Sequence, residues 1–263
     1  DLGVWFLQQA MHERHGVYAK QVKYRVGKTR GGASGGTVYS ILNMLDEAKD
    51  DPSVGRVVSD PYALNPPGVP RGKDRNDQRN ARYDSDFDSW TAPFVMAAIN
   101  TRVVRRSNAL LGFPWGEDFR YDETVLTGGG LGGWSKAVAA AGGSAIGMGM
   151  LAFPPTRKLL SRVLPEPGAG PDKEQRENGC YEIFLHGKHP EVSERDVRVR
   201  VYGDRDPGYG STSKMLAEAA LCLALDDLQV GGGFWTPASV MAAPLTERLN
   251  ANAGVEFSVL DDA

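Results

Sequence analysis

One eight-residue stretch, Arg30 to Thr37, combines the residue types that bind a polar group. It reads Arg-Gly-Gly-Ala-Ser-Gly-Gly-Thr, so four glycines, two hydroxyls and one guanidinium lie close together. Glycine lets a ligand or another backbone approach the main chain, and a helix beginning behind it would point free N–H groups at that group. We therefore predict that Arg30, Ser34, Gly35 and Thr37 bind a polar end of a substrate. The alternative is a tight strand-to-helix turn with no ligand.

A second cluster, Tyr209 and Ser211–Lys214, places a phenol, three hydroxyls and an amine at the expected start of a helix. Such a helix end can hold an anion or a carbonyl oxygen, and a tyrosine or lysine can transfer a proton. Tyr209 and Lys214 are therefore the predicted catalytic residues. The simpler alternative is that Ser211 or Ser213 only caps the helix.

Two further residues, Trp235 and Thr236, are predicted to contact substrate. Thr236 stands directly before Pro237, a pair that favours the first turn of a helix. Metal ligation is not predicted, because His12, His15 and the other two histidines show no zinc-like pairing with cysteine.

These residues need a scaffold, and apolar periodicity indicates one that mixes helices and strands. Helices are predicted over 2–15, 38–49 and 92–111, and strands over 18–26 and 119–126. The last third adds strands near 181–185, 197–201 and 255–259 and a buried helix over 215–225. The pattern predicts an α+β fold, with a mixed, largely antiparallel sheet covered by helices.

Residues 50–91 are predicted to form an irregular excursion, because prolines and polar residues dominate them. The segment is either a solvated surface excursion or a lid or partner-docking arm. Arg102, Arg105 and Arg106 follow at helical spacing and are interpreted as a solvated face.

Two glycine-rich features follow the strand over 119–126. Residues 128–133 match G-x-G-x-x-G, but the strand before them is charged and no acidic-ended second strand follows, so no dinucleotide site is expected there. Residues 133–164 are predicted to be an apolar helical segment. Its charge-free run over 137–153 is short for a membrane span. It indicates a buried or groove-lining helix, or else a surface for a long apolar substrate or a bilayer.

Composition excludes several classes of protein. The 263 residues carry a net charge of −3, which gives no basic field for nucleic acid. Cys180 and Cys222 are too few for a disulfide framework, so a reducing, cytoplasmic location is expected. The chain begins with Asp1 rather than methionine, and we expect it to be the later part of a longer protein.

Several blocks together resemble the saccharopine dehydrogenase-like oxidoreductases, and most closely the trans-acting enoyl reductases. The blocks are residues 30–37, Asp60-Pro-Tyr-Ala-Leu64, 92–107, Gly116-Glu-Asp-Phe-Arg-Tyr121, 214–225 and Gly233-Phe-Trp-Thr-Pro-Ala-Ser239. The resemblance implies that residues 1–263 are the second, substrate-binding and dimerising domain of such a reductase. The N-terminal dinucleotide-binding domain would then be absent from this chain, and NAD(P) would be bound mainly by it.

The same resemblance implies a function in polyketide-lipid assembly. It predicts reduction of an acyl or lipid-like enoyl substrate, a homodimer, a polyketide synthase partner and peripheral membrane contact. One alternative is a non-catalytic, lipid-associated binding protein that keeps the dehydrogenase shape. Another is a saccharopine-type amino-acid dehydrogenase, for which Arg102, Arg105 and Arg106 would have to bind a dicarboxylate.

Overall fold

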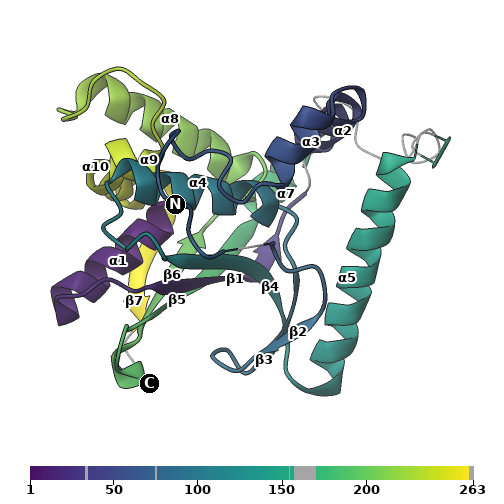
Figure 1. Ribbon diagram of the computed structural model, residues 1–263, viewed down its shortest axis with the longest axis horizontal. Coiled ribbons are helices and arrows are strands. Elements are labelled where there is room, and N and C mark those ends of the chain that lie inside the picture. Colours follow the sequence, from purple (N-terminus) through teal and green to yellow (C-terminus); the bar gives the residue numbers. More distant parts are fainter. Residues whose placement is uncertain (33–34, 75, 154, 157–169, 261–263) are drawn as a thin grey trace.

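A seven-stranded sheet organises the protein, whose structure is a computed structural model that describes residues 1–32, 35–74, 76–153, 155–156 and 170–260 (Figure 1). The strand order is β2-β3-β4-β1-β5-β6-β7. Their bounds are β1 Gln21–Arg30, β2 Arg82–Asp84, β3 Ser89–Pro93, β4 Arg120–Gly128, β5 Cys180–Lys188, β6 Val197–Gly203 and β7 Val255–Leu260. Only β1 and β4 pair in parallel among the described strands, which confirms the mixed, largely antiparallel sheet.

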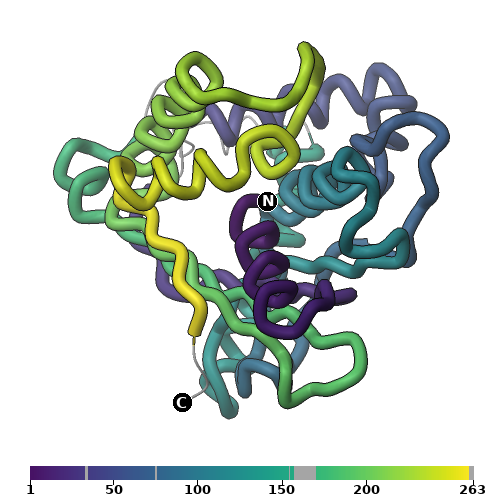
Figure 2. The backbone as a smooth tube through the Cα atoms, turned by 90° about the vertical axis from the view of Figure 1, so that its left-hand side faces the viewer, coloured from purple at the N-terminus to yellow at the C-terminus, as the bar shows by residue number. Residues whose placement is uncertain are grey.

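Helices gather on one face of this sheet (Figure 1). They are α1 Leu2–His15, α4 Ala97–Leu110, α8 Gly210–Leu225, α9 Pro237–Val240 and α10 Ala242–Arg248. From the side, α1 descends between β7 and α4 (Figure 2). The remaining helices are α2 Gly35–Asp50, α3 Pro52–Ser59, α5 Gly130–Ala152, α7 Lys173–Glu177, the 3₁₀ turn η1 Ser193–Arg195 and the π-helical turn η2 Leu249–Ala253.

The core lies between the sheet and these helices, and β6 shows why. Val197, Val199 and Val201 are buried, while the two arginines between them are half-buried. Successive side chains of a strand point to opposite faces, so one face of β6 is apolar and the other is not. Leu7 and Met11, four residues apart on α1, pack in the same core cluster.

The prediction of an irregular excursion over residues 50–91 is wrong at both of its ends. α3 begins at Pro52, which is favoured in the first turn, and the Asp51 side chain accepts the Ser53 N–H at 2.8 Å as its cap. β2 and β3 form an antiparallel hairpin before residue 93. Between Asp60 and residue 81 no helix or strand is present in the described part, where prolines fix φ and remove N–H donors.

The apolar segment predicted over residues 133–164 is helical from 133 to Ala152 and again at 155–156, and residues 154 and 157–164 lie outside the described part. It is not buried, however. Leu131 and Ile146 are 84% and 66% exposed, and only Gly133 and Ala137 of α5 are buried. The helix packs on β3 and β4 through its first two turns and then runs along the side of the molecule (Figure 1). None of the described helices has the length and apolarity needed to cross a membrane.

Candidate functional site

An apolar groove of about 690 Å³ lies between α2, α3 and the start of α4. Its size falls within the range of small-molecule sites. Its walls come from three helices, the loop after α3, and single residues of α5 and the turn before α8. The lining residues are Gly36, Thr37, Ser40, Ile41, Met44, Val57, Val58, Ala63, Leu64, Val95, Met96, Ala98, Ile99, Arg102, Met148 and Tyr209.

Two helical faces oppose each other across this apolar groove. On α2, Thr37, Ile41 and Met44 are spaced by four and three residues, which places them on one face. On α4, Ile99 and Arg102 share a face in the same way. The groove is open enough that Ile99 remains 51% exposed. An elongated apolar ligand would therefore lie between α2 and α4.

The structure brings together the two clusters that the sequence singled out, since Thr37 and Tyr209 both line the apolar groove. Behind them the backbones pack closely. A Cβ added at Gly31 would lie 2.8 Å from Cβ of Asp206, and one at Gly32 would lie 3.3 Å from Cβ of Pro171. Gly31 therefore serves tight packing against the turn before α8 and Gly32 against the segment before α7, as the alternative interpretation of the stretch expects.

The other residues predicted from the stretch Arg30 to Thr37 to bind substrate do not all lie at the apolar groove. Arg30 is exposed and ends β1, where it pairs with Cys180 of β5. Gly35 is buried at the first position of α2. Ser34 lies outside the described residues. Of the four predicted contacts, Thr37 is the one that the structure places in the groove wall.

The N-cap of α8 is Tyr209, and the side chain that binds the N–H groups at this helix end is that of Asp206 rather than Ser211 or Ser213. Both carboxylate oxygens of Asp206 accept the Tyr209 N–H at 3.1 Å, and the N–H groups of Gly208 and Gly210 bind at 2.9 and 3.0 Å. Ser211 instead shares a 3.0 Å hydrogen bond with the hydroxyl of Tyr181. Because Asp206 occupies these N–H groups, they are not available to a substrate anion.

A second cavity, the α8 pocket, has a volume of about 820 Å³ and contains both predicted catalytic residues. Tyr209 belongs to the walls of the α8 pocket and of the apolar groove, so it lies at their junction. Four basic residues and two acidic ones give the α8 pocket a positive balance. The lining residues are Gly170, Pro171, Asp172, Lys173, Arg176, Glu177, Arg205, Tyr209, Gly210, Ser213 and Lys214.

Trp235 and Thr236 do not line either cavity. Thr236 is 5% exposed, shares a 2.8 Å hydrogen bond with Ser107 and forms a capping box with Ser239 at the start of α9. The indole Nε1 of Trp235 donates to the carbonyl oxygen of Gly231 at 2.9 Å. The structure therefore gives Thr236 a helix-capping role and does not bring either residue to the groove.

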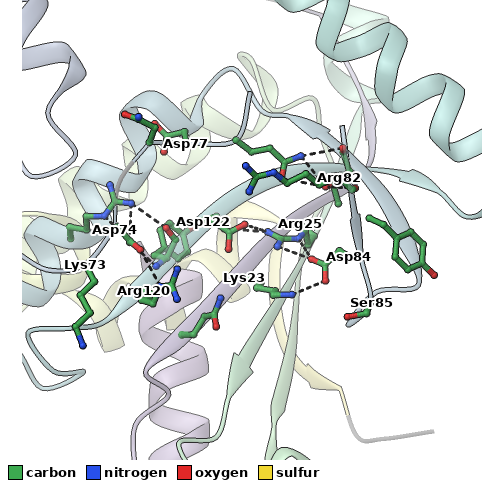
Figure 3. Close-up of a pocket in the computed structure, with 17 residues that line it drawn as sticks. Lys23, Arg25, Lys73, Asp74, Asp77, Arg82, Asp84, Ser85, Arg120 and Asp122 are labelled. Carbon is green, nitrogen blue, oxygen red and sulfur yellow. Dashed lines mark hydrogen bonds and ion pairs between the residues drawn. The ribbon is translucent and has the colours of Figure 1, made fainter. Parts of the chain in front are cut away.

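A charged pocket of about 450 Å³ lies where β1 and β4 meet residues 73–85 (Figure 3). Figure 3 shows Arg25 between two carboxylates, and its Nη atoms lie 2.7 Å from Asp84 and 2.6 Å from Asp122. Burial alone would raise the pKa of Asp84, but Lys23 and Arg25 outweigh it and lower that pKa. These ion pairs fasten the β2–β3 hairpin to the sheet, so we interpret the charged pocket as structural.

The prediction that the α4 arginines form a solvated face is wrong for two of the three. Arg102 and Arg105 are 7% and 5% exposed, and they pair with Asp77 at 2.5 Å and Asp74 at 3.0 Å. Burial of an arginine requires such a partner. The sequence contained a signal for this pairing, because Arg102 and Arg105 are three residues apart and so are Asp74 and Asp77.

The described residues do not fit a dinucleotide at residues 128–133. A Cβ at Gly133 would lie 1.8 Å from the carbonyl oxygen of Gly128, so this glycine is needed for the turn itself. The next described strand after α5 is β5, which pairs antiparallel with β1, whereas in a dinucleotide-binding unit the strand after the helix lies parallel to the strand before it and in the same sheet. In the described part of the chain, no group of three or more metal-ligating side chains occurs either.

Comparison with known proteins gives relatives over nearly the whole chain. A Mycobacterium tuberculosis (strain H37Rv) protein named "Putative trans-acting enoyl reductase" is 38% identical over 271 residues, which cover 98% of this chain and 63% of the relative. The trans-acting enoyl reductases of Mycobacterium bovis (strain BCG) and Mycobacterium ulcerans (strain Agy99) are 34% and 33% identical. They cover 84% and 82% of the chain and 55% and 54% of their own length.

The chain thus spans less than two thirds of the length of these relatives. No family model matches it, and no solved structure matches it. The matches nevertheless confirm the resemblance that the sequence blocks indicated.

Proposed function

We propose, on the premise that this chain is homologous to the trans-acting enoyl reductases, that it is the substrate-binding part of such an oxidoreductase. In this proposal the apolar groove holds the acyl chain of a lipid-like or polyketide-type enoyl substrate. The observation that carries the proposal is the composition of the groove wall, which combines apolar side chains from α2, α3 and α4 with Thr37 and Tyr209.

The groove is suited to an acyl chain for a simple physical reason. Burying apolar surface stabilises a complex by about 25 cal/mol per Å², and side chains such as Ile41, Met44 and Val57 offer mainly such surface. Methionine also adapts to ligands of different shape. Binding there would restrain the chain next to Tyr209, and positioning is the main requirement of a hydride-transfer reaction.

We assign NAD(P) to a part of the full-length protein outside this chain, because residues 128–133 do not fit a dinucleotide. The cofactor would supply the hydride. Within this chain, Tyr209 or Lys214 is the proposed proton donor. Tyr209 is the stronger candidate of the two, since it borders both the apolar groove and the α8 pocket.

The proposal is tested with the full-length protein. NADPH and NADH are titrated by fluorescence, and turnover of a 2-dodecenoyl-N-acetylcysteamine thioester is followed through cofactor oxidation. We expect cofactor binding and turnover, with turnover reduced in Tyr209→Phe and less affected in Lys214→Met. Tight binding of the acyl thioester with no affinity for either cofactor would contradict the reductase and favour a non-catalytic, lipid-associated binding protein.

That second candidate function has one observation in its favour, the exposed apolar helix α5. Ile146 of this helix is 66% exposed and Phe153, its C-cap, is 59% exposed, and the glycines of its later turns have open space beside them. A cytoplasmic protein with peripheral lipid contact would use such a surface, as would a homodimer or a polyketide synthase complex. Two measurements on the Ile146→Glu variant separate these uses. Flotation with phosphatidylcholine vesicles tests lipid contact, and sedimentation equilibrium tests self-association.

A further inference from the structure

Among the described residues that line the apolar groove, Arg102 alone carries a charge. It is 7% exposed, so the charge is almost fully removed from water. It also lines a neighbouring hollow together with Met44, Val58 and Ala98, whereas Tyr209 borders the α8 pocket. The two polar side chains therefore lie toward different ends of the groove.

All the hydrogen bonds of Arg102 to described residues come from Nη1. Its Nη1 donates to Asp77 Oδ2 at 2.5 Å, to Thr101 Oγ1 at 2.8 Å and to the carbonyl oxygen of Ala97 at 3.5 Å. Its Nε is buried and has no acceptor among the described residues. A buried N–H without an acceptor is costly and uncommon in a folded protein.

Arg105, one turn further along α4, shows what full pairing of such a side chain looks like. It is 5% exposed, and its Nε, Nη1 and Nη2 all have acceptors, including both N–H groups that face Asp74 at 3.1 and 3.0 Å. Arg105 does not line the apolar groove. Of these two buried arginines of α4, the one with an unpaired Nε is therefore the one that lines the groove.

We propose that Arg102 is a specificity-determining residue, whose guanidinium binds the carbonyl oxygen of a neutral acyl derivative, an ester or thioester, in preference to a free carboxylate. The inference rests on the proposed function, because it assumes an acyl ligand in the groove. Asp77 already neutralises the guanidinium at 2.5 Å. A carbonyl oxygen accepts a guanidinium N–H without adding charge, whereas a carboxylate would bring an uncompensated negative charge into an apolar site.

The test compares methyl dodecanoate with dodecanoate in the full-length protein, through displacement of the neutral dye Nile red. We expect wild-type protein to bind the ester at least tenfold more tightly. In Arg102→Lys the charge stays but the N–H is displaced, so ester binding should weaken by about tenfold and the preference should shrink. Arg105→Lys disturbs an equally buried arginine outside the groove and should keep the preference.

A second variant tests the charge argument independently. In Asp77→Asn the guanidinium loses its neutralising partner, so dodecanoate should gain affinity relative to the ester. Equal binding of both ligands by wild-type protein, or an unchanged preference in Arg102→Lys, would overturn the role of Arg102. Failure of both ligands to bind wild-type protein would instead contradict the proposed function, so the two failures are distinguishable.

Discussion

Asp206 binds the backbone N–H of Tyr209 through both of its carboxylate oxygens, at 3.1 Å each. The side chain that caps α8 thus also fixes the residue at the junction of the apolar groove and the α8 pocket. Asp206 is fully buried, and Gly31 packs against its Cβ. One carboxylate therefore holds together the two sequence clusters on which the proposed site depends.

Asp206→Ala is expected to lower the free energy of unfolding by about 2 kcal/mol, because three backbone N–H groups lose an acceptor whose side chain is fully buried. Urea unfolding measures the change. Asp172→Ala is the matched control, since Asp172 caps the short, exposed helix α7. We expect the control to cost less than about 1 kcal/mol. Equal costs at the two positions would show that the Asp206 cap has no special importance.

Ile99→Glu is expected to weaken acyl-chain binding at least tenfold, because it places a carboxylate in the apolar wall of the groove. Leu216→Glu, on the exposed face of α8, makes the same chemical change outside the groove. Both positions are exposed enough that stability should change by less than about 1 kcal/mol. Dodecanoyl ligands are titrated against both variants. Equal loss of binding in Ile99→Glu and Leu216→Glu would indicate that the ligand lies outside the apolar groove.

Asp86 should contribute stability that disappears in acid. Burial alone would raise its pKa, but hydrogen bonds from Lys23 and Lys188 outweigh this and lower the pKa from 3.8 to about 2. A carboxylate whose pKa is lower in the folded state stabilises the protein above its unfolded pKa. That contribution, about 2 kcal/mol, is lost as the pH falls from about 4 to about 2.

The Asp86→Asn variant measures this contribution directly. Its urea-unfolding free energy should fall by about 2 kcal/mol less than that of wild type between pH 4 and pH 2. Asp227→Asn, at an exposed carboxylate, is the control and should follow the wild-type curve. Identical acid dependence in Asp86→Asn and wild type would mean that the Lys23 and Lys188 contacts contribute nothing.

Much of the fold could be predicted from the sequence, because apolar residues recur at a regular spacing wherever one face of a helix or strand is buried. Alternation in residues 197–201 and 255–259 marks β6 and β7, and helical spacing marks α1 and α4. The hairpin of β2 and β3 was missed because its strands are only three and five residues long. Too few residues alternate there to reveal a period.

The site was less predictable, since it depends on contacts between residues far apart in the chain. The closeness of Thr37 and Tyr209 follows from packing that no local pattern encodes. The role of Asp206 was missed because this carboxylate stands three residues before Tyr209, the N-cap of α8, rather than at the N-cap itself. The burial of Arg102 depends on Asp77, which lies in a segment without regular structure.

Gly133→Ala and Gly132→Ala should have opposite effects on the anchoring of α5. A Cβ at Gly133 would lie 1.8 Å from the carbonyl oxygen of Gly128, and it cannot be accommodated unless the first turn of α5 leaves β4. We expect a cost of about 3 kcal/mol or displacement of the helix.

A Cβ at Gly132 meets nothing within 4 Å. There alanine should stabilise the protein by about 0.5–1 kcal/mol through its higher helix propensity. Urea unfolding measures stability, and hydrogen exchange across residues 130–140 reports whether α5 stays docked. Protection that is unchanged in Gly133→Ala would mean that the close approach of Gly128 and Gly133 does not anchor this helix.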